Sequence, residues 1–312
     1  MLACAAVSAG YAAGYPDRPV RLIVPTPPGG AADTAARVIA PRLSEILGQQ
    51  LVVDNRGGAS GRIGGTMAAR AAPDGYTLLA LIATQITDAA VTRNVPYDLE
   101  RDFAPISRTV TVPSVLIAHP SLAVKSTQEL IALAKSRPGQ IQFASGSVGG
   151  TSDLAMGLFQ SMAGIRMISV PYKGVGPALV DVFAGHVPLM IGSLISALPH
   201  IKSGRVRALG VTSPRRSGAA PDIPTIAEAG LPGYAADTWS GLVAPAGTPR
   251  EIILRLHSAV VQALQDPAIS KRFVDDGADA TPSNSPEEFA VFVRAELAKW
   301  TKVVNDAGLR SE

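Results

Sequence analysis

The chain has 312 residues, of which 47% are hydrophobic and 17% are charged, so it can bury a sizeable core and broad disorder is excluded. Its formal net charge of +3 argues against a nucleic-acid groove, which needs clustered Lys and Arg. Beyond the first 14 residues, no segment reaches the roughly 18 uninterrupted apolar residues of a membrane-spanning helix.

The first 14 residues are uncharged, small and mostly apolar. They resemble the end of a secretory signal whose basic start is missing, which indicates an exported protein with a truncated leader. An ordinary disordered N-terminus is the open alternative. The single cysteine, Cys4, lies in this segment, and whether it carries a lipid stays open. The cysteine-free remainder tolerates an oxidising compartment without proving one.

The stretch 21–37 organises the rest of the chain. An apolar run at 22–24 is followed by the Pro- and Gly-rich loop 25–30 and then by a helical pattern of apolar residues. The first turn of a helix has backbone N–H groups without partners, and the helix dipole is positive there. Strand, glycine loop and helix therefore predict an anion site, although a tight connection that binds nothing has the same pattern.

Strands and helices alternate along the chain. Pro41 lies inside the first helical pattern, so we expect a kink or a restart there. The early βαβαβ order predicts a parallel sheet covered on both faces. Strands are expected at 22–24, 51–53, 76–82, 114–118, 141–144, 168–170, 187–191, 207–211 and 239–243, and helices at 61–72, 127–136, 153–162, 177–184, 198–203, 249–265, 267–275 and 286–307. Residues 213–233 are expected to form a surface loop.

A second glycine-rich loop, 145–152, joins a strand to a helix in the same way as the first. Two such units predict two α/β lobes with a ligand cleft between them. We expect the chain to pass between the lobes near 102–107 and again near 235–242. Lobe 1 is then residues 15–104 plus 239–312, lobe 2 is residues 105–238, and residues 1–14 are the leader. Two crossing segments let such lobes close as rigid bodies around a ligand.

Several stretches carry a resemblance to a known family. They span nearly the whole chain from Tyr15 and include YPDRPVRLIVPTPPGGAAD, LVVDNRGGASGRIGG, AAPDGYTLL, VPYDLERDFAPIS, ISVPYKGVGPAL, SALPHIKSGRVRALGVTS, PDIPTIAEAGLPGY and GLVAPAGTP. The chain resembles the Bug/TctC family, the periplasmic solute-binding receptors of tripartite tricarboxylate transporters. The resemblance implies a two-lobed, type II-like periplasmic binding protein, each lobe a sheet flanked by helices. It also implies a small carboxylate ligand, gripped by main-chain groups of two opposed loops that correspond to 25–33 and 145–153.

The site departs from the family pattern at three places. Thr26 stands where Phe is usual, Asp153 where His is frequent, and Gly192-Ser193 where Asp-Asn is common. The smaller Thr26 leaves room for a ligand larger or more polar than a compact amino acid. The expected ligand-binding residues are Thr26, Pro28, Gly29, Gly30, Ala31, Asp33, Thr84, Ser145, Gly146, Gly150, Thr151, Ser152, Asp153, Gly192 and Ser193.

Most of these residues also have ordinary structural interpretations. Asp33 and Asp153 suit the first turn of a helix, where they cap it or face its dipole. The hydroxyls of the second loop can bond the local backbone. Lys173, beside a turn, can pair with an acidic ligand or stay solvated, and Thr84 sits at a strand end where pockets form.

Two enzyme classes fit poorly. The glycines at 58, 61 and 64 lack G-x-G-x-x-G spacing, and no G-x-S-x-G elbow is present. The four histidines are scattered, so we expect no metal site, no cofactor and no enzyme activity. The expected partners are a small organic acid or amino-acid-like ligand and the membrane permease subunits of the transporter, with no nucleic acid, and the protein is expected to be a monomer. A periplasmic sensor that presents its ligand to a signalling partner is the open alternative.

Overall fold

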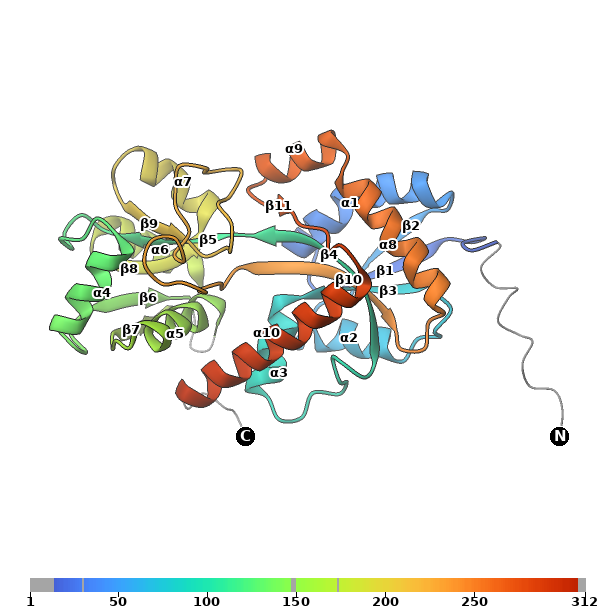
Figure 1. The fold of residues 1–312 in the computed structure, drawn as a ribbon, viewed down its shortest axis with the longest axis horizontal. Helices are drawn as coiled ribbons and strands as arrows, with labels where there is room; N and C mark the ends of the chain where they lie inside the picture. Colours follow the sequence, from blue (N-terminus) through green and yellow to red (C-terminus); the bar gives the residue numbers. More distant parts are fainter. Residues whose placement is uncertain (1–13, 30, 147–149, 173, 308–312) are drawn as a thin grey trace.

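The computed structural model describes residues 14–29, 31–146, 150–172 and 174–307. It consists of two α/β units lying end to end, here called lobe 1 and lobe 2 (Figure 1). Each unit is built on its own sheet, six-stranded in lobe 1 and five-stranded in lobe 2. The expectation of two lobes, each a sheet flanked by helices, is confirmed.

Lobe 1 combines both ends of the described chain. Its elements are β1 (Val20–Val24), α1 (Ala31–Leu47), β2 (Leu51–Asn55), η1 (Ala59–Gly61), α2 (Arg62–Ala69), β3 (Thr77–Ile82), α3 (Ala83–Val91), β4 (Phe103–Val112), β10 (Thr238–Pro245), α8 (Arg250–Leu264), α9 (Pro267–Asp275), β11 (Asp279–Ala280) and α10 (Pro286–Ala307). The strand order is β11-β4-β10-β3-β1-β2. Because β1 pairs in parallel with both β2 and β3, the predicted βαβαβ unit is confirmed.

Lobe 2 is built from the middle of the chain. Its elements are β5 (Ser114–Ala118), α4 (Thr127–Ser136), β6 (Gln142–Ser145), α5 (Thr151–Ala163), β7 (Ile168–Pro171), α6 (Val175–Ala184), β8 (Leu189–Ser193), α7 (Leu194–Lys202) and β9 (Arg207–Val211). The strand order is β7-β6-β8-β5-β9, with β6 parallel to β7 and β8. The segment after β9 runs to Thr238 without a helix or strand element, as expected, but it is not a surface loop throughout, because Thr225, Ile226 and Leu231 are buried.

Two antiparallel strands connect the lobes. β4 stays paired with β10 as far as Val112, opposite Thr238, and β5 of lobe 2 begins two residues later at Ser114. The first passage is therefore at Pro113, not in the expected range 102–107. The sequence did not predict a strand at 103–112, where Pro105 and Arg108 interrupt the apolar residues. The second passage precedes Thr238, inside the expected range.

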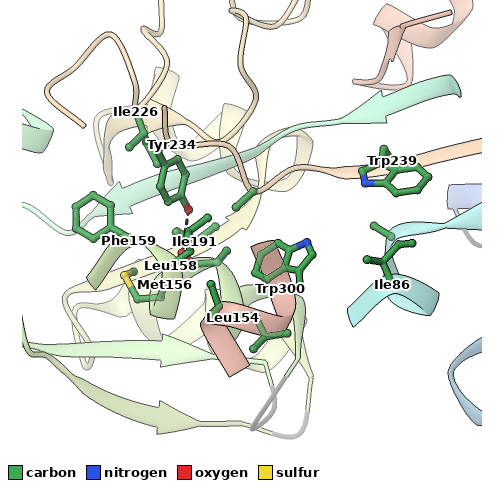
Figure 2. Close-up of a cluster of buried hydrophobic side chains, with 14 of the residues drawn as sticks. Ile86, Leu154, Met156, Leu158, Phe159, Ile191, Ile226, Tyr234, Trp239 and Trp300 are labelled. Atoms are coloured by element: carbon green, nitrogen blue, oxygen red, sulfur yellow. Dashed lines mark hydrogen bonds between the residues drawn. The ribbon is translucent and has the colours of Figure 1, made fainter. Parts of the chain in front are cut away.

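The helix α10 is a third connection between the lobes. Figure 1 shows it running from the six-stranded sheet toward α5 of lobe 2. Its apolar stripe is buried as predicted, with Phe289, Val293 and Trp300 almost fully covered. Figure 2 shows Trp300 and Leu154 of α5 in one buried cluster with Ile86 of α3, so the hydrophobic core is continuous across the two lobes.

A carboxylate fixes α10 to the second crossing strand. Both indole N–H groups, of Trp239 and Trp300, donate to Oε2 of the buried Glu296, at 3.2 and 3.1 Å. Lys299 pairs with the other oxygen of Glu296 and donates to the Ala235 carbonyl at 2.9 Å. This network joins α10 to the segment where the chain passes between the lobes.

Two local features differ from what the sequence predicted, an additional helix and the absence of a restart at Pro41. α3 follows β3 directly and was not expected, since no turn residue separates the buried strand from the helix. α1 is continuous across Pro41, so the helix does not restart there. The missing N–H removes one helical bond, but the buried residues Ile39, Leu43 and Leu47 on the same face keep the helix packed.

Candidate ligand-binding site

The loop between β1 and α1 is held by one buried carboxylate. Asp33 accepts hydrogen bonds from the Gly29 backbone N–H at 2.8 Å and from Arg37 Nε and Asn55 Nδ2, both at 2.9 Å. The Asn55 amide also donates to the Thr26 carbonyl at 3.1 Å. The carboxylate and amide together tie both ends of the loop to the start of α1.

These contacts decide the charge of Asp33. Burial opposes ionisation, but the Gly29 N–H, the Arg37 guanidinium and the Asn55 amide outweigh it and hold the pKa of Asp33 below its ordinary value. Both oxygens are already occupied within the protein. Asp33 therefore acts on the loop, which matches the capping interpretation rather than direct contact with a ligand.

A pocket of about 120 Å³ lies beside this loop, where lobe 1 meets the crossing strands. It is enclosed by the ends of β1 and β3, the first turns of α1 and α3, and the lobe-2 ends of β4 and β10. Its lining residues are Thr26, Ala31, Ala32, Ile82, Thr84, Val110, Val112, Thr238, Trp239 and Ser240. The structure thus brings together three expected site residues, Thr26, Ala31 and Thr84.

The lining is apolar with a few hydroxyl groups. None of the ten lining residues is ionisable, and six are Ala, Val, Ile or Trp. Thr26 Oγ1 is buried, and it has no hydrogen-bond partner in the described part of the chain. Such an orphaned hydroxyl is costly unless something fills the site and bonds it.

Two helices begin at this pocket. The first turn of α1 contributes Ala31 and Ala32, and the first turn of α3 contributes Thr84. Gln85 fixes the start of α3, because its side chain accepts from the Ile82 N–H at 3.3 Å and donates to Tyr97 at 3.0 Å. Helix N-termini present unpaired N–H groups and a positive dipole end, so the pocket attracts an anion without using a basic side chain.

Several lining residues were not predicted from the sequence. Val110 and Val112 come from a strand that was not expected, and Thr238 and Ser240 come from the crossing strand β10. Their only sequence signal is the alternating polar and apolar pattern of the two strands. Their approach to α1 depends on the tertiary fold.

The second glycine loop lies at the edge of the lobe 2 sheet. Gly146 N–H donates to Ser152 Oγ at 3.0 Å, and the Gly146 carbonyl accepts from Gly174 at 2.7 Å. Ser145 is fully buried at the end of β6, and its carbonyl accepts from Tyr172. These groups shape the loop, and they do not line the pocket in lobe 1.

The rest of this loop leads into α5. Gly150 is the N-cap residue and Thr151, which opens the helix, is exposed. Asp153 Oδ1 accepts from Ser169 Oγ at 2.8 Å, so this carboxylate faces β7.

Gly192 and Ser193 end β8, opposite Val115 and Ser114 of β5. Because β6 and β8 are parallel neighbours, their C-terminal ends meet at one edge of the sheet. The lobe 2 candidates therefore lie together. Pro28 and Gly29 are exposed on the first loop outside the pocket lining, and the predicted Gly30 and Lys173 lie outside the described residues.

A larger hollow of about 610 Å³ lies elsewhere between the lobes. Thr111 of β4 lines it, and side chains alternate along a strand, so it is on the opposite face of β4 from Val110 and Val112. Arg108, Arg215 and Arg216 line the same hollow. Burial lowers the pKa of Arg108, whose Nε donates to the Thr281 carbonyl at 3.1 Å.

Two searches of the described residues have negative results. Within the described ranges, no three His, Cys, Asp or Glu side chains gather in a way that could hold a metal ion. No helix in that part of the chain is long and apolar enough to cross a membrane.

Two α/β lobes joined by a pair of crossing strands, with a pocket against those strands, define a two-lobed solute-binding protein. Residues 35–309 match the family described as "Tripartite tricarboxylate transporter family receptor". The chain belongs to this family of receptors, which confirms the predicted family and a binding role rather than an enzymatic one. Members of the family are periplasmic binding proteins.

Relatives cover almost the whole chain. Protein BugT of Bordetella pertussis is 39% identical over 312 residues, covering 99% of this chain and 95% of BugT. A Rhodopseudomonas palustris protein, Rpa4515 with adipate, is 38% identical with a TM-score of 0.73, covering 94% of this chain and 98% of its own. MatC (Rpa3494) from the same organism, with bound malate, is 33% identical with a TM-score of 0.70, covering 93% and 100%. A TctC solute-binding protein from Polaromonas with no ligand is 26% identical with a TM-score of 0.85, covering 94% and 99%.

Proposed function

We propose that this receptor captures a small carboxylate between its lobes and delivers it to the permease subunits of a tripartite tricarboxylate transporter. The observation that carries the proposal is the lobe 1 pocket, where α1 and α3 both begin and no lining side chain is charged. Backbone N–H groups at two helix starts suit a carboxylate, and an uncharged lining leaves that charge to them.

The solved relatives support this ligand class. Adipate is bound to Rpa4515 and malate to MatC, and both ligands are carboxylates. The two ligands differ in length and polarity. The family relationship therefore supports a carboxylate ligand but does not specify the rest of the ligand molecule. That choice depends on the lining of the pocket in this chain.

Lobe 2 supplies the opposite wall of the proposed site. Its contribution is the edge formed by the loop at Gly146, the start of α5 at Gly150–Asp153, and the end of β8 at Gly192–Ser193. A ligand that contacts both lobes binds better when the lobes approach each other, and this difference in affinity drives closure. Residues near Pro113 and Asp237 change their backbone angles in this movement, and α10 shifts against α5, which it contacts across the lobes.

The comparison with relatives supports such a movement. The Polaromonas protein with no ligand matches this structure more closely, at a TM-score of 0.85, than the adipate complex does at 0.73, although it is less identical in sequence. A rigid rotation of one lobe lowers the overall similarity without changing either lobe. A difference in lobe rotation would account for the lower score of the adipate complex.

A receptor that delivers its ligand to a permease in this way acts in the periplasm. The family relationship and the signal-like N-terminus both support export. The protein is expected to act as a monomer that meets the permease when it is loaded.

The test begins with the ligand itself. Ligand released from purified, denatured protein is identified by mass spectrometry, and its affinity is measured by titration calorimetry. We expect a carboxylate that binds with 1:1 stoichiometry and lowers the radius of gyration in solution scattering. Thr26→Phe, which fills the pocket, should abolish binding while the circular dichroism spectrum stays unchanged. A ligand without a carboxylate contradicts the proposal, and full affinity in Thr26→Phe contradicts the placement of the ligand in the lobe 1 pocket.

A further inference from the structure

We propose that the pocket selects carboxylates whose body is mainly hydrocarbon and carries no amino group, and that it rejects amino acids. This inference rests on the proposed function and narrows its ligand class. The sequence alone left an organic acid and an amino-acid-like ligand equally open.

The lining of the lobe 1 pocket is the first observation. Ile82, Val110, Val112 and Trp239 form an apolar wall between the two helix starts. Trp239 is almost fully buried, and its indole N–H is already bonded to Glu296, so the ring presents only apolar surface to the pocket. A hydrocarbon body gains from contact with such a wall, because burial removes both surfaces from water.

The second observation is that the described lining of this pocket offers an ammonium group no carboxylate. None of the ten lining residues carries a carboxylate. Asp33 is near the loop, but its oxygens accept from Gly29, Arg37 and Asn55. Asp153 of lobe 2 faces Ser169. A buried ammonium without a paired anion is strongly disfavoured, so the free energy of binding falls when the ligand carries one.

The size of the pocket limits the body of the ligand. A cavity of about 150 Å³ lined by aliphatic and aromatic side chains holds one benzene molecule. The pocket here is about 120 Å³. On that scale, the lobe 1 half of the site accommodates a body of about four to six carbon atoms.

Thr26 supplies the polar contact in this account. Its Oγ1 is buried at the pocket wall without a partner in the described ranges, while Ser240 Oγ already pairs with Thr109 Oγ1 at 3.1 Å. Thr26 lines the pocket, and a rotation about its Cα–Cβ bond would turn the buried hydroxyl toward a ligand carboxylate beside the start of α1, which would accept from it. The unbonded hydroxyl then lowers the stability of the unliganded protein, and ligand binding removes this penalty by providing an acceptor.

The main experiment compares matched pairs of ligands by titration calorimetry on the intact protein. Each pair shares one carbon skeleton and differs by an amino group: hexanoate and norleucine, succinate and aspartate, adipate and 2-aminoadipate. We expect the member without the amino group to bind at least a hundredfold more tightly in every pair that binds. An amino acid that binds as tightly as its partner overturns the inference but leaves the proposed carboxylate receptor standing. If no carboxylate binds, and none is released from the purified protein, the proposed function fails as well.

Two valine variants test the role of Thr26. Thr26→Val should weaken binding of the best carboxylate at least tenfold, yet raise the urea midpoint of the unliganded protein, because an unbonded buried hydroxyl is removed. Thr127→Val is the matched control, since its buried hydroxyl donates to the Leu209 carbonyl at 2.9 Å. The control should lower the urea midpoint and leave affinity unchanged. Unchanged affinity in Thr26→Val, or a lowered midpoint there, overturns the assigned contact.

Discussion

Replacing Asp33 by Asn tests whether one carboxylate positions the first ligand loop. The carboxyl group is 4% exposed and accepts three hydrogen bonds, from Gly29, Arg37 and Asn55. An amide keeps one acceptor oxygen, which can serve Arg37 and Asn55. Its NH₂ group then faces the Gly29 N–H, so the bond that holds the glycine is lost and two donors oppose each other.

The structure sets the size of the effect. A hydrogen bond to a charged group contributes about 1.5–3 kcal/mol, and an exposed ion pair contributes at most about 1 kcal/mol. The Arg37 side chain is 53% exposed, so its share is small. Losing the Gly29 bond and weakening the Asn55 bond should cost about 2–3 kcal/mol of the free energy of unfolding. The untethered loop should weaken carboxylate binding at least tenfold.

Urea denaturation and titration calorimetry measure the two effects. Asp54→Asn is the control, because Asp54 pairs with the half-exposed Arg21 and Arg56 away from the pocket. We expect it to cost at most about 1 kcal/mol and to leave affinity unchanged. The pKa of Asp33 is depressed in the folded protein, so its contribution is present above the unfolded pKa of about 3.9 and is lost as the pH falls through the folded value. A loss below about 0.5 kcal/mol with unaltered affinity would refute the positioning role.

Three further predictions concern the loop, the crossing strand and the pocket wall. Gly57→Ala places a Cβ 2.9 Å from Pro27 in the β1–α1 loop, so this variant should bind the ligand more weakly. Gly176→Ala is the control, because a Cβ there meets open space. Equal affinities of the two variants in titration calorimetry would rule out the clash. Burial, reinforced by the charge of a neighbouring carboxylate, raises the pKa of Asp237 to about 6. Ionisation of Asp237 therefore lowers the free energy of unfolding of the wild type as the pH rises from about 4 to about 6. Asp237→Asn should be the more stable protein in urea at pH 7. The same pH dependence of stability in both proteins would count against this prediction. Trp239 lines the pocket and Trp300 does not. Ligand should therefore change the tryptophan emission of Trp300→Phe as it does in the wild type. Loss of the emission change in this variant would show that Trp300, not Trp239, reports ligand binding.

The sequence was sufficient for elements marked by local signals. The β1 strand, the Pro- and Gly-rich loop and the start of α1 were predicted because strand, turn and helix each have their own residue pattern. The stripe at Phe289, Val293 and Trp300 was predicted to be core from its helical spacing alone. What that spacing did not indicate is that the last turns of α10 pack on lobe 2.

The missed elements lack local signals. α3 contains two Thr residues and follows a buried strand with Ile82 as N-cap, and Ile is not a preferred capping residue. β4 contains Pro105 and Arg108, which are unusual inside a paired strand. Together they contribute Thr84, Val110 and Val112 to the pocket lining, and of these only Thr84 was predicted from the sequence.

The candidate site was predictable where it depends on the backbone. Thr26, Ala31 and Thr84 lie at strand ends and helix starts, and the pocket includes all three. Asp33 was predicted as a ligand-binding residue with a capping role as the alternative, and the sequence did not indicate that Asn55 and Arg37 would share its carboxylate. Val110 and Thr238 join the pocket only because two strands distant in sequence cross between the lobes.

The most direct test of the central claim is a crystal structure with the carboxylate that binds most tightly. The account predicts carboxylate oxygens within hydrogen-bonding distance of the start of α1 and of Thr26 Oγ1. The ligand body should lie against Trp239, with the lobe 2 loop at Gly146 closed over it. A carboxylate held instead in the hollow on the opposite face of β4, by Arg108 and Arg215, would contradict the account.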